Sequence, residues 1–463
     1  MDGSTLKPLI CFLLLPAVLL SGCAHTSTRL TAPEAPNPET VADVQRDVAA
    51  GWRPTSIQAD SNTTLLTSNS TASATNDTKL SSLESFESLA LSSNPTIALH
   101  QARVDAAEGR RLQVGLRPNP FAGLSIQEIG NDRSAGQYGA YLGQQYVRGD
   151  KLRLNRNAAQ WEVARAEQEL AAQQLRVLTD VRRAFYSTLV AQQRVKVARE
   201  LHDIAHQAVL KARELIKNQK PRTVLTQCEI ELELASLLLE NSQTATRMRW
   251  RRLVTLAGEP DRPLQPVSGT TEGSVPKLVW EQLLERIRQQ SPELAAAVAD
   301  VERTGWALQR ANVERIPNVT VQAGAFYDDA SRDPFATLQV SMPIPINNWN
   351  QGGIAEAQAN SIAAHKGVQQ VELSLNFRLA DVYRRYEQAR QQAARYDDAV
   401  LAKARQNLDL NRQSYEIGES SYLSVLTAQR SYARARLAAL NAREQLWLAT
   451  VEIQGLLLTG SLD

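Results

Sequence analysis

The stretch from Asp150 to Lys220 reads DKLRLNRNAAQWEVARAEQELAAQQLRVLTDVRRAFYSTLVAQQRVKVARELHDIAHQAVLKARELIKNQK and contains neither glycine nor proline. A single helix of about seventy residues would be about 100 Å long. The average helix of a globular protein has only about 11–12 residues. The stretch therefore predicts one very long helix rather than an ordinary domain helix.

Apolar residues recur along this stretch mostly in steps of three and four, which places them on one helix face. They are Leu178, Val181, Phe185, Leu189, Val195, Ala198, Leu201, Ala205, Ala208, Ala212 and Leu215. Because many of them are alanines, neighbouring helices can approach closely. A lone helix cannot bury such a stripe, so we predict packing against other long helices. A plain structural coiled coil fits the stripe equally well.

Composition excludes several classes of protein. The chain carries 51 basic and 49 acidic residues, a net charge of +2, and no basic patch that would indicate nucleic-acid binding. Only 5% of the residues are aromatic, which favours extended helices over a large globular core. Cys11, Cys23 and Cys228 are too scattered for a disulfide framework or a zinc knuckle.

The first residues have the pattern of an export signal. Lys7 precedes an apolar run from Leu9 to Leu20, which is too short to span a bilayer but suits a signal peptide. The run ends in Leu20-Ser-Gly-Cys23, which resembles a bacterial lipobox. We therefore predict a signal peptide over 1–22 and a lipid on Cys23, with an ordinary cleavage site as the alternative.

Residues 23–80 are rich in Ser, Thr, Asn, Pro and Ala. Such a composition buries too little apolar surface to offset the entropy of ordering. We predict a low-complexity tether between the lipid and the folded part. In the lipoprotein pattern, Ala24 in place of aspartate favours the outer membrane.

The rest of the chain contains an internal repeat. The interval from Pro95 to Pro120 equals that from Pro292 to Pro317. Self-similarity of this kind is an architectural signal. We predict repeats over 81–260 and 277–460, joined by a linker over 261–276. Each repeat is expected to read helix, strand, loop, strand, very long helix, turn, helix.

Short runs with period-two alternation precede each long helix. In each run, apolar residues alternate with polar residues or glycine. The apolar residues are Val319, Val321, Ala323 and Ala325 over 318–326, Leu338, Val340 and Met342 over 335–342, and Leu124 and Ile126 in the first half. A weaker fourth run covers 140–147. This pattern predicts half-buried strands, and runs of about 9–11 residues can cross a bilayer as tilted barrel strands. A soluble hairpin is the alternative, but neither half offers a further globular core to pack one.

The number of strands predicts an oligomer. Four strands per chain cannot close a membrane barrel, whose lower limit is about eight. A barrel of about eight strands is filled by its own side chains, whereas three chains would supply twelve strands and a water-filled lumen. An open strand edge is not tolerated in lipid. We therefore predict a trimer.

A resemblance to a known family adds to this prediction. The phrase SYEIGESSYLSVLTAQ over 414–429, with the repeat order, resembles the TolC family of outer-membrane efflux proteins over about 83–460. The phrase PIPI over 343–346, followed by Asn347-Asn348-Trp349, is most similar to the branch that exports cobalt, zinc and cadmium or copper and silver.

The resemblance implies a mainly α protein: a long α-helical coiled-coil barrel below a twelve-stranded β-barrel formed by a homotrimer in the outer membrane. It also implies a periplasmic adaptor and an inner-membrane RND-type pump as partners. The chain would then passively conduct metal cations or small toxic molecules to the exterior. A structural periplasmic coiled-coil lipoprotein and an outlet for type I protein secretion are the alternatives.

The same resemblance points to two helix–turn–helix tips. The first, with Lys217, Lys220 and Pro221, lacks the usual glycine. Acidic rings in such channels follow the second turn, where this chain has Ser424 and Thr427 instead. The candidate tip and gate residues of the second turn are Tyr415, Glu416, Gly418, Glu419, Ser424 and Thr427. We hypothesise that Glu416 and Glu419 supply the missing charge and give the mouth a cation preference.

One further pattern suggests chemistry. His202 and His206 are four residues apart, a spacing that can hold a metal, but no third ligand beyond Asp203 is evident. A solvated helix face is the better interpretation. The sequence contains no phosphate loop and no nucleophile elbow. We therefore predict no enzyme, no cofactor and no resident metal.

Overall fold

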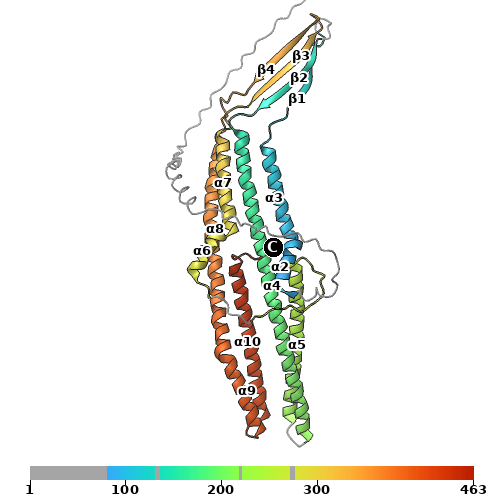
Figure 1. Cartoon of the computed structure of the whole chain (residues 1–463), viewed down its shortest axis with the longest axis vertical. Helices are drawn as coiled ribbons and strands as arrows, with labels where there is room; N and C mark the ends of the chain where they lie inside the picture. Colours follow the sequence, from blue (N-terminus) through green and yellow to red (C-terminus); the bar gives the residue numbers. More distant parts are fainter. Residues whose placement is uncertain (1–80, 131–135, 218–221, 272–276, 463) are drawn as a thin grey trace, which may run out of the picture. The chain divides into compact units, whose positions relative to one another are not determined.

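The structure is a computed structural model that describes residues 81–130, 136–217, 222–271 and 277–462. The predicted signal peptide over 1–22, the lipidated Cys23 and the tether that follows it up to residue 80 lie outside the described residues. The helices and strands that follow are shown in Figure 1. They are α2 (Leu83–Ser93), α3 (Pro95–Val114), β1 (Phe121–Gln127), β2 (Gln137–Tyr146), α4 (Lys151–Lys217), α5 (Arg222–Leu256), α6 (Trp280–Gln290), α7 (Pro292–Asn312), β3 (Val319–Asp328), β4 (Asp333–Ser341), α8 (Gln351–Arg395), α9 (Leu401–Glu416) and α10 (Tyr422–Gln454).

The long helix predicted between Gly149 and Pro221 is confirmed as α4, with 67 residues. Most of its predicted stripe is buried, including Val181, Phe185 and Ala198. The second long helix extends over 351–416, but a π-helix at Tyr396–Val400 joins α8 to α9. Such a single-turn π segment inside a helix has no simple sequence signature, and we did not predict it.

Helix starts follow the repeated Asn-Pro and Ser-Pro signals. Asn94 caps α3 because its side-chain oxygen accepts a hydrogen bond from the Thr96 amide at 3.0 Å. Ser291 caps α7 in the same way through the Leu294 amide. In both helices a proline occupies the first turn, where no amide hydrogen is needed. The two halves of the chain therefore begin their helices by the same chemistry.

The four strands form one antiparallel sheet in the order β1-β2-β3-β4. β2 of the first half pairs with β3 of the second half, so the sheet joins the two halves. β3 and β4 extend beyond the runs predicted over 318–326 and 335–342, because Tyr327 pairs with Pro334 and Asp328 with Asp333. The ladder thus continues into polar residues where the apolar alternation has already ended.

The helices pack in two sets. α3, α4, α7 and α8 contact one another in that order next to the sheet, and α4 with α5 and α9 with α10 form the pairs that end in the two tips (Figure 1). α10 also contacts α4 and α8. None of the described helices is both long enough and apolar enough to cross a membrane.

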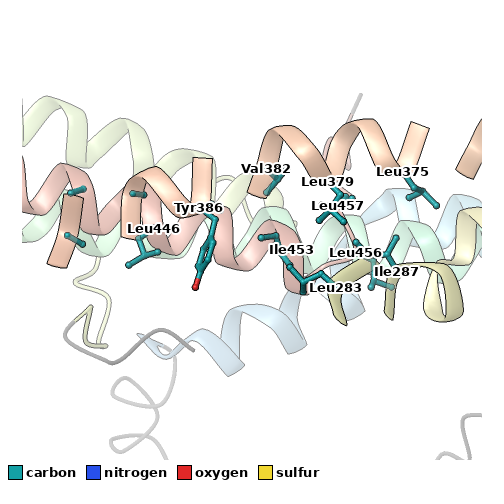
Figure 2. Packing of buried hydrophobic residues seen from close by; sticks show 14 residues of the cluster. Leu283, Ile287, Leu375, Leu379, Val382, Tyr386, Leu446, Ile453, Leu456 and Leu457 are labelled. Carbon is teal, nitrogen blue, oxygen red and sulfur yellow. The ribbon is translucent and has the colours of Figure 1, made fainter. Parts of the chain in front are cut away.

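Two hydrophobic cores form where the short helices α2 and α6 pack on the long ones. Phe86 of α2 is completely buried among Val181 and Phe185 of α4 and Trp250 of α5. In the second core, Leu283 and Ile287 of α6 lie with Leu379 and Tyr386 of α8 and with Ile453 of α10 (Figure 2). The sequence analysis did not predict α2 or α6 as separate helices, yet each completes the core of its own half.

Candidate functional site

One face of the sheet is apolar and uncovered. The strand register places Leu142, Ala323 and Leu338 in one row across the sheet, and Leu124 lies on the same face opposite Ala140. Leu124 is 83% exposed and Leu338 is 74% exposed, although both are large apolar side chains. Contiguous exposed apolar surface of this kind marks a contact with a membrane or another protein. The alternation predicted from sequence is therefore confirmed.

The opposite face combines glycines with aromatic rings. Phe121 pairs with Gly143, and Tyr141 pairs with Gly123. A Cβ atom on either glycine would collide with the ring opposite it. Phe121 and Tyr141 themselves meet edge to face, with ring centroids 6.4 Å apart. The glycines thus allow the rings to lie across the neighbouring strand, which keeps this face smooth.

Both outer strands of the sheet have a free edge. Among the described strands, β1 pairs only with β2, and β4 pairs only with β3. Every residue of β4 is exposed. Unpaired amide and carbonyl groups along an edge are a template for pairing with another strand. The sheet therefore has two edges ready to receive further strands.

The second tip is a tight turn between α9 and α10. Gly418 has a φ of 80°, and its amide donates to the carbonyl of Tyr415 at 3.1 Å. The Glu419 amide donates to the carbonyl of Ser414 at 2.9 Å. These two bonds make a Schellman ending, in which a left-handed residue closes the helix. The turn leaves Glu416 and Glu419 exposed on the same short loop.

The other predicted residues of this tip lie on its two helices. Tyr415 packs on Tyr422, with ring centroids 5.3 Å apart. The Ser424 hydroxyl lies 3.2 Å from the Ser421 hydroxyl. Thr427 is exposed, and its hydroxyl donates to the Leu423 carbonyl. The structure therefore brings the predicted tip residues together, with Glu416 and Glu419 as the acidic groups.

The first tip is only partly described. α4 ends at Lys217 and α5 begins at Arg222. Lys220 and Pro221 lie outside the described residues, as does the side chain of Lys217.

An apolar cluster joins the two tips. Cys228 of α5 is buried against Ala212 of α4 and Leu426 of α10, and Tyr422 packs on the same cluster. Burial raises the pKa of the Cys228 thiol, so it stays protonated. Burial, with the nearby Cys228 and Tyr415, raises the pKa of Tyr422 to about 12. Cys228 is thus a packing residue.

Charged side chains tie α10 to the first half of the chain. Arg430 pairs with Glu231 of α5, and Arg436 pairs with Glu200 of α4. Glu444 lies between two arginines, with Arg194 at 2.5 Å and Arg249 at 3.0 Å. The side chain of Glu444 is only 6% exposed. Sequence reasoning missed this buried carboxylate, because its partners are about two hundred residues away.

The histidine pair does not form a larger site. The rings of His202 and His206 are nearly parallel, with centroids 6.5 Å apart. Within the described residues, no group of three or more His, Cys, Asp or Glu side chains could hold a metal ion. The arrangement offers no catalytic constellation, and the sheet and the tips remain the candidate functional surfaces.

Comparison with known proteins decides between the remaining classes. A family model described as outer membrane efflux protein matches residues 283–457. The second half of the chain thus matches the family that the sequence resembles. The match indicates an outer membrane efflux channel rather than an enzyme.

Relatives of this efflux protein span both of its halves. It is 26% identical over 376 residues to the cobalt-zinc-cadmium resistance protein CzcC of Cupriavidus metallidurans. The alignment covers 81% of this chain and 89% of CzcC. Its fold is similar to that of the outer membrane protein VceC of Vibrio cholerae, with a TM-score of 0.66, 18% identity and coverage of 81% and 95%. The Campylobacter jejuni CmeC outer membrane channel gives a TM-score of 0.67, 15% identity and coverage of 81% and 85%. The predicted family and fold class are therefore confirmed, whereas the heavy-metal branch stays a prediction with the 26% identity to CzcC in its favour.

Proposed function

We propose that three copies of this chain form one efflux channel, in which their sheets join into a twelve-stranded barrel. The observation that carries this proposal is the sheet with two free edges and an uncovered apolar face. In lipid every backbone polar group must be paired, so the edges of β1 and β4 must each meet a strand of another copy. Three sheets are the smallest set that leaves a water-filled lumen.

In this assembly the two faces of the sheet have different surroundings. The face with Leu124 and Leu338 meets lipid, and the face with Gly143 and Tyr141 lines the lumen. Polar residues such as Gln339 and Thr337 also lie on the lumen face, because they alternate with Leu338 along β4. This division matches the outward-apolar, inward-polar alternation of membrane barrels.

A matched pair of substitutions on β4 tests this division. Leu338→Arg puts a charge on the lipid face, where it costs about 2–4 kcal/mol at the bilayer centre. Gln339→Arg puts the same charge on the next residue, which faces the lumen. We expect Leu338→Arg to reduce the channel in the outer membrane fraction severalfold, and Gln339→Arg to leave it near the wild-type amount. Equal loss in both variants would contradict the proposed orientation of the sheet.

The number of copies is tested by native mass spectrometry of the detergent-extracted mature protein. We expect a mass of three chains. Monomers alone, under conditions that preserve other trimeric channels, would leave the strand edges unclosed and would contradict the proposal. The same spectrum tests the predicted lipid, because each chain should begin at Cys23 and carry acyl groups.

The lipid anchor is the finer part of the proposal and rests on sequence. The phrase Leu20-Ser-Gly-Cys23 after a short apolar run supports diacylglycerol attachment at Cys23. Two or more acyl chains anchor a protein stably, whereas one chain gives only marginal binding. Replacing Cys23 by serine should therefore yield chains without acyl mass, and an unchanged mass increment would contradict the lipobox.

For cargo and partners we propose metal cations or small toxic molecules, passed to the tips by a periplasmic adaptor and an inner-membrane RND-type pump. The similarity to the cobalt-zinc-cadmium resistance protein supports metal cations as the first choice. The chain itself supplies a passive duct. Deletion of the gene followed by growth on zinc, cobalt and cadmium, with dyes and antibiotics in parallel, distinguishes the two cargo classes.

We also propose that Glu416 and Glu419 give the periplasmic mouth its cation preference. Both carboxylates are exposed on the tight turn at Gly418, and three copies would bring six of them to one opening. A mouth lined by one sign of charge concentrates ions of the opposite sign. In planar bilayers, the double variant Glu416→Gln, Glu419→Gln should lose this preference. Unchanged cation selectivity would contradict the role of these glutamates.

A further inference from the structure

A large cavity lies away from the sheet and the tips, where α3, α4, α7 and α8 meet. Its volume is about 850 Å³. Its charged and titratable wall residues are His100, Arg103, Arg165, Glu169, Arg176, Glu293 and Arg378. A volume of this size is typical of sites for small molecules, which usually measure about 300–1,000 Å³.

Positive charge exceeds negative charge on this wall. Four arginines face two glutamates. Glu293 is shared by two of the arginines, because Arg176 contacts it at 2.7 Å and Arg378 also pairs with it. Glu169 pairs with Arg165 at 2.9 Å. The carboxylates therefore neutralise only part of the guanidinium charge.

Arg103 adds to this excess. Across the described residues it makes no ion pair and no hydrogen bond, and its side chain reaches the cavity from α3. Asp300 is also shared, because it lies 3.1 Å from Arg165 and 2.9 Å from Arg303. The acidic groups near the cavity are thus each committed to arginines other than Arg103.

Two buried polar atoms of the wall have no partner within the described part of the chain. They are Nδ1 of His100 and Nε of Arg378. A buried donor without an acceptor costs about 1–3 kcal/mol, and more where the group is charged. Burial lowers the pKa of His100, and the nearby Arg103 and Arg176 lower it further, while Glu169 acts in the opposite direction. Acceptor oxygens with negative charge would satisfy both the excess guanidinium charge and the free Nε donor of Arg378.

We propose that this cavity binds small solutes that carry two or more carboxylate or phosphate groups. Arg103 makes the first contact at the α3 wall, and Arg378 offers its free Nε from α8. The planar guanidinium groups suit oxyanions, which accept two parallel hydrogen bonds from one arginine. All wall residues belong to one chain, so the site does not depend on the proposed trimer.

The charge of this site would also be opposite to that of the tips. The proposed mouth, with Glu416 and Glu419, attracts cations, whereas the cavity attracts anions. A solute that carries both a metal ion and carboxylate groups would be attracted by both. The anion site is thus a selectivity element separate from the mouth.

Calorimetric titration of the full-length, detergent-solubilised protein at low salt tests the site, with pyrophosphate and citrate as probes. We expect saturable binding by the wild type and at least about tenfold weaker binding by Arg103→Gln, because one charge-assisted contact is lost. Arg111→Gln is the matched control, since Arg111 lies about two turns further along α3 and outside the cavity. This control should bind within about twofold of the wild type.

Two results would overturn the proposal: no saturable heat with the wild type, or equal weakening in Arg103→Gln and Arg111→Gln, which would indicate a general charge effect. Circular dichroism verifies that both variants fold. Native mass spectrometry of the same samples reports the number of copies. Failure of the trimer and failure of the anion site are therefore distinguishable.

Discussion

The sheet and the helical body differ in how well a single chain covers its own side chains. Leu338 on β4 is 74% exposed, whereas Leu379 on α8 is completely buried. The helical body has its own cores, each completed by a short helix. The sheet has no core and two free edges. The helical body therefore buries two cores within one chain, while the large apolar side chains of the sheet stay uncovered.

The largest expected effect separates these two leucines. Leu379→Ala removes a side chain packed by α6 and α10, and such changes cost about 2–5 kcal/mol of unfolding free energy. Leu338→Ala on the exposed sheet face should change it by no more than about 0.5 kcal/mol. The denaturation midpoint of the helical circular dichroism signal measures both. Similar midpoints for the two variants would contradict the idea that Leu379 stabilises a buried core and Leu338 does not.

Charge burial gives the next effect. Glu444→Gln leaves Arg194 and Arg249 without their carboxylate between α4, α5 and α10. Both arginines are partly exposed, so we expect a loss of about 1.5–3 kcal/mol, below that of a fully buried pair. The control is Glu162→Gln at the exposed pair with Arg110, where about 0–1 kcal/mol is expected. The same denaturation midpoint applies, and an equal shift in both variants would contradict a special role for Glu444.

The long helix α4 and the buried Glu444 show what the sequence could and could not predict. Local patterns sufficed for α4 and the strands, because periodicity and the absence of proline are properties of neighbouring residues. The Glu444 site forms only where α4, α5 and α10 meet in the folded chain, so no local sequence pattern predicts it. α6 could have been predicted, because Leu283 and Ile287 are four residues apart and mark an apolar helix face.

The candidate site divides in the same way. The turn around Gly418 and its neighbour Glu416 were predicted from the family resemblance of one local phrase, 414–429. The rings that lie across Gly123 and Gly143 did not, because they come from neighbouring strands. The cavity with Arg103 and Arg378 joins helices from both halves, and nothing in either half alone shows it. The sequence therefore revealed the surfaces built by one segment and missed those built by several.

The glycines of the sheet provide a test within the sheet itself. Gly143→Val would place side-chain atoms inside the Phe121 ring, so the ring must move at a cost of about 1–3 kcal/mol. Ala140→Val on the apolar face of the same strand meets open surroundings and is the control. We expect Gly143→Val to lower the fraction of assembled channel in native mass spectrometry. If Ala140→Val lowered it as much, the packing of rings on glycine would not matter.

Replacing glycine by alanine should change stability in opposite directions at the turn between α9 and α10 and in the middle of α3. Gly418→Ala keeps open space around the new methyl group but forces a left-handed backbone, which costs about 1–2 kcal/mol. Gly109→Ala, in the middle of α3 with equally open space, should stabilise the helix by about 0.5–1 kcal/mol. Thermal melting of both variants measures the difference. Shifts of the same sign would contradict the assigned turn.

The last comparison concerns pH at the junction of the two tips, which is packed like the rest of the helical body. The pKa of Tyr422 is raised to about 12, first by burial and then by Cys228 and Tyr415. The unfolded chain ionises a tyrosine at about 10, so the unfolded state loses this proton first as the pH rises. The stabilising contribution of neutral Tyr422 is therefore complete below pH 10 and disappears as the pH passes 12.

Tyr422→Phe isolates this contribution, because phenylalanine keeps the ring and has no proton to lose. We expect the wild type to lose stability relative to this variant as the pH rises from 10 to 12, while the two respond alike below pH 10. The ultraviolet absorbance of the phenolate, compared between the two proteins, reports the ionisation of Tyr422 directly. Ionisation near pH 10 would mean that water reaches the ring, and the junction of the tips would then resemble the uncovered sheet rather than the packed helical body.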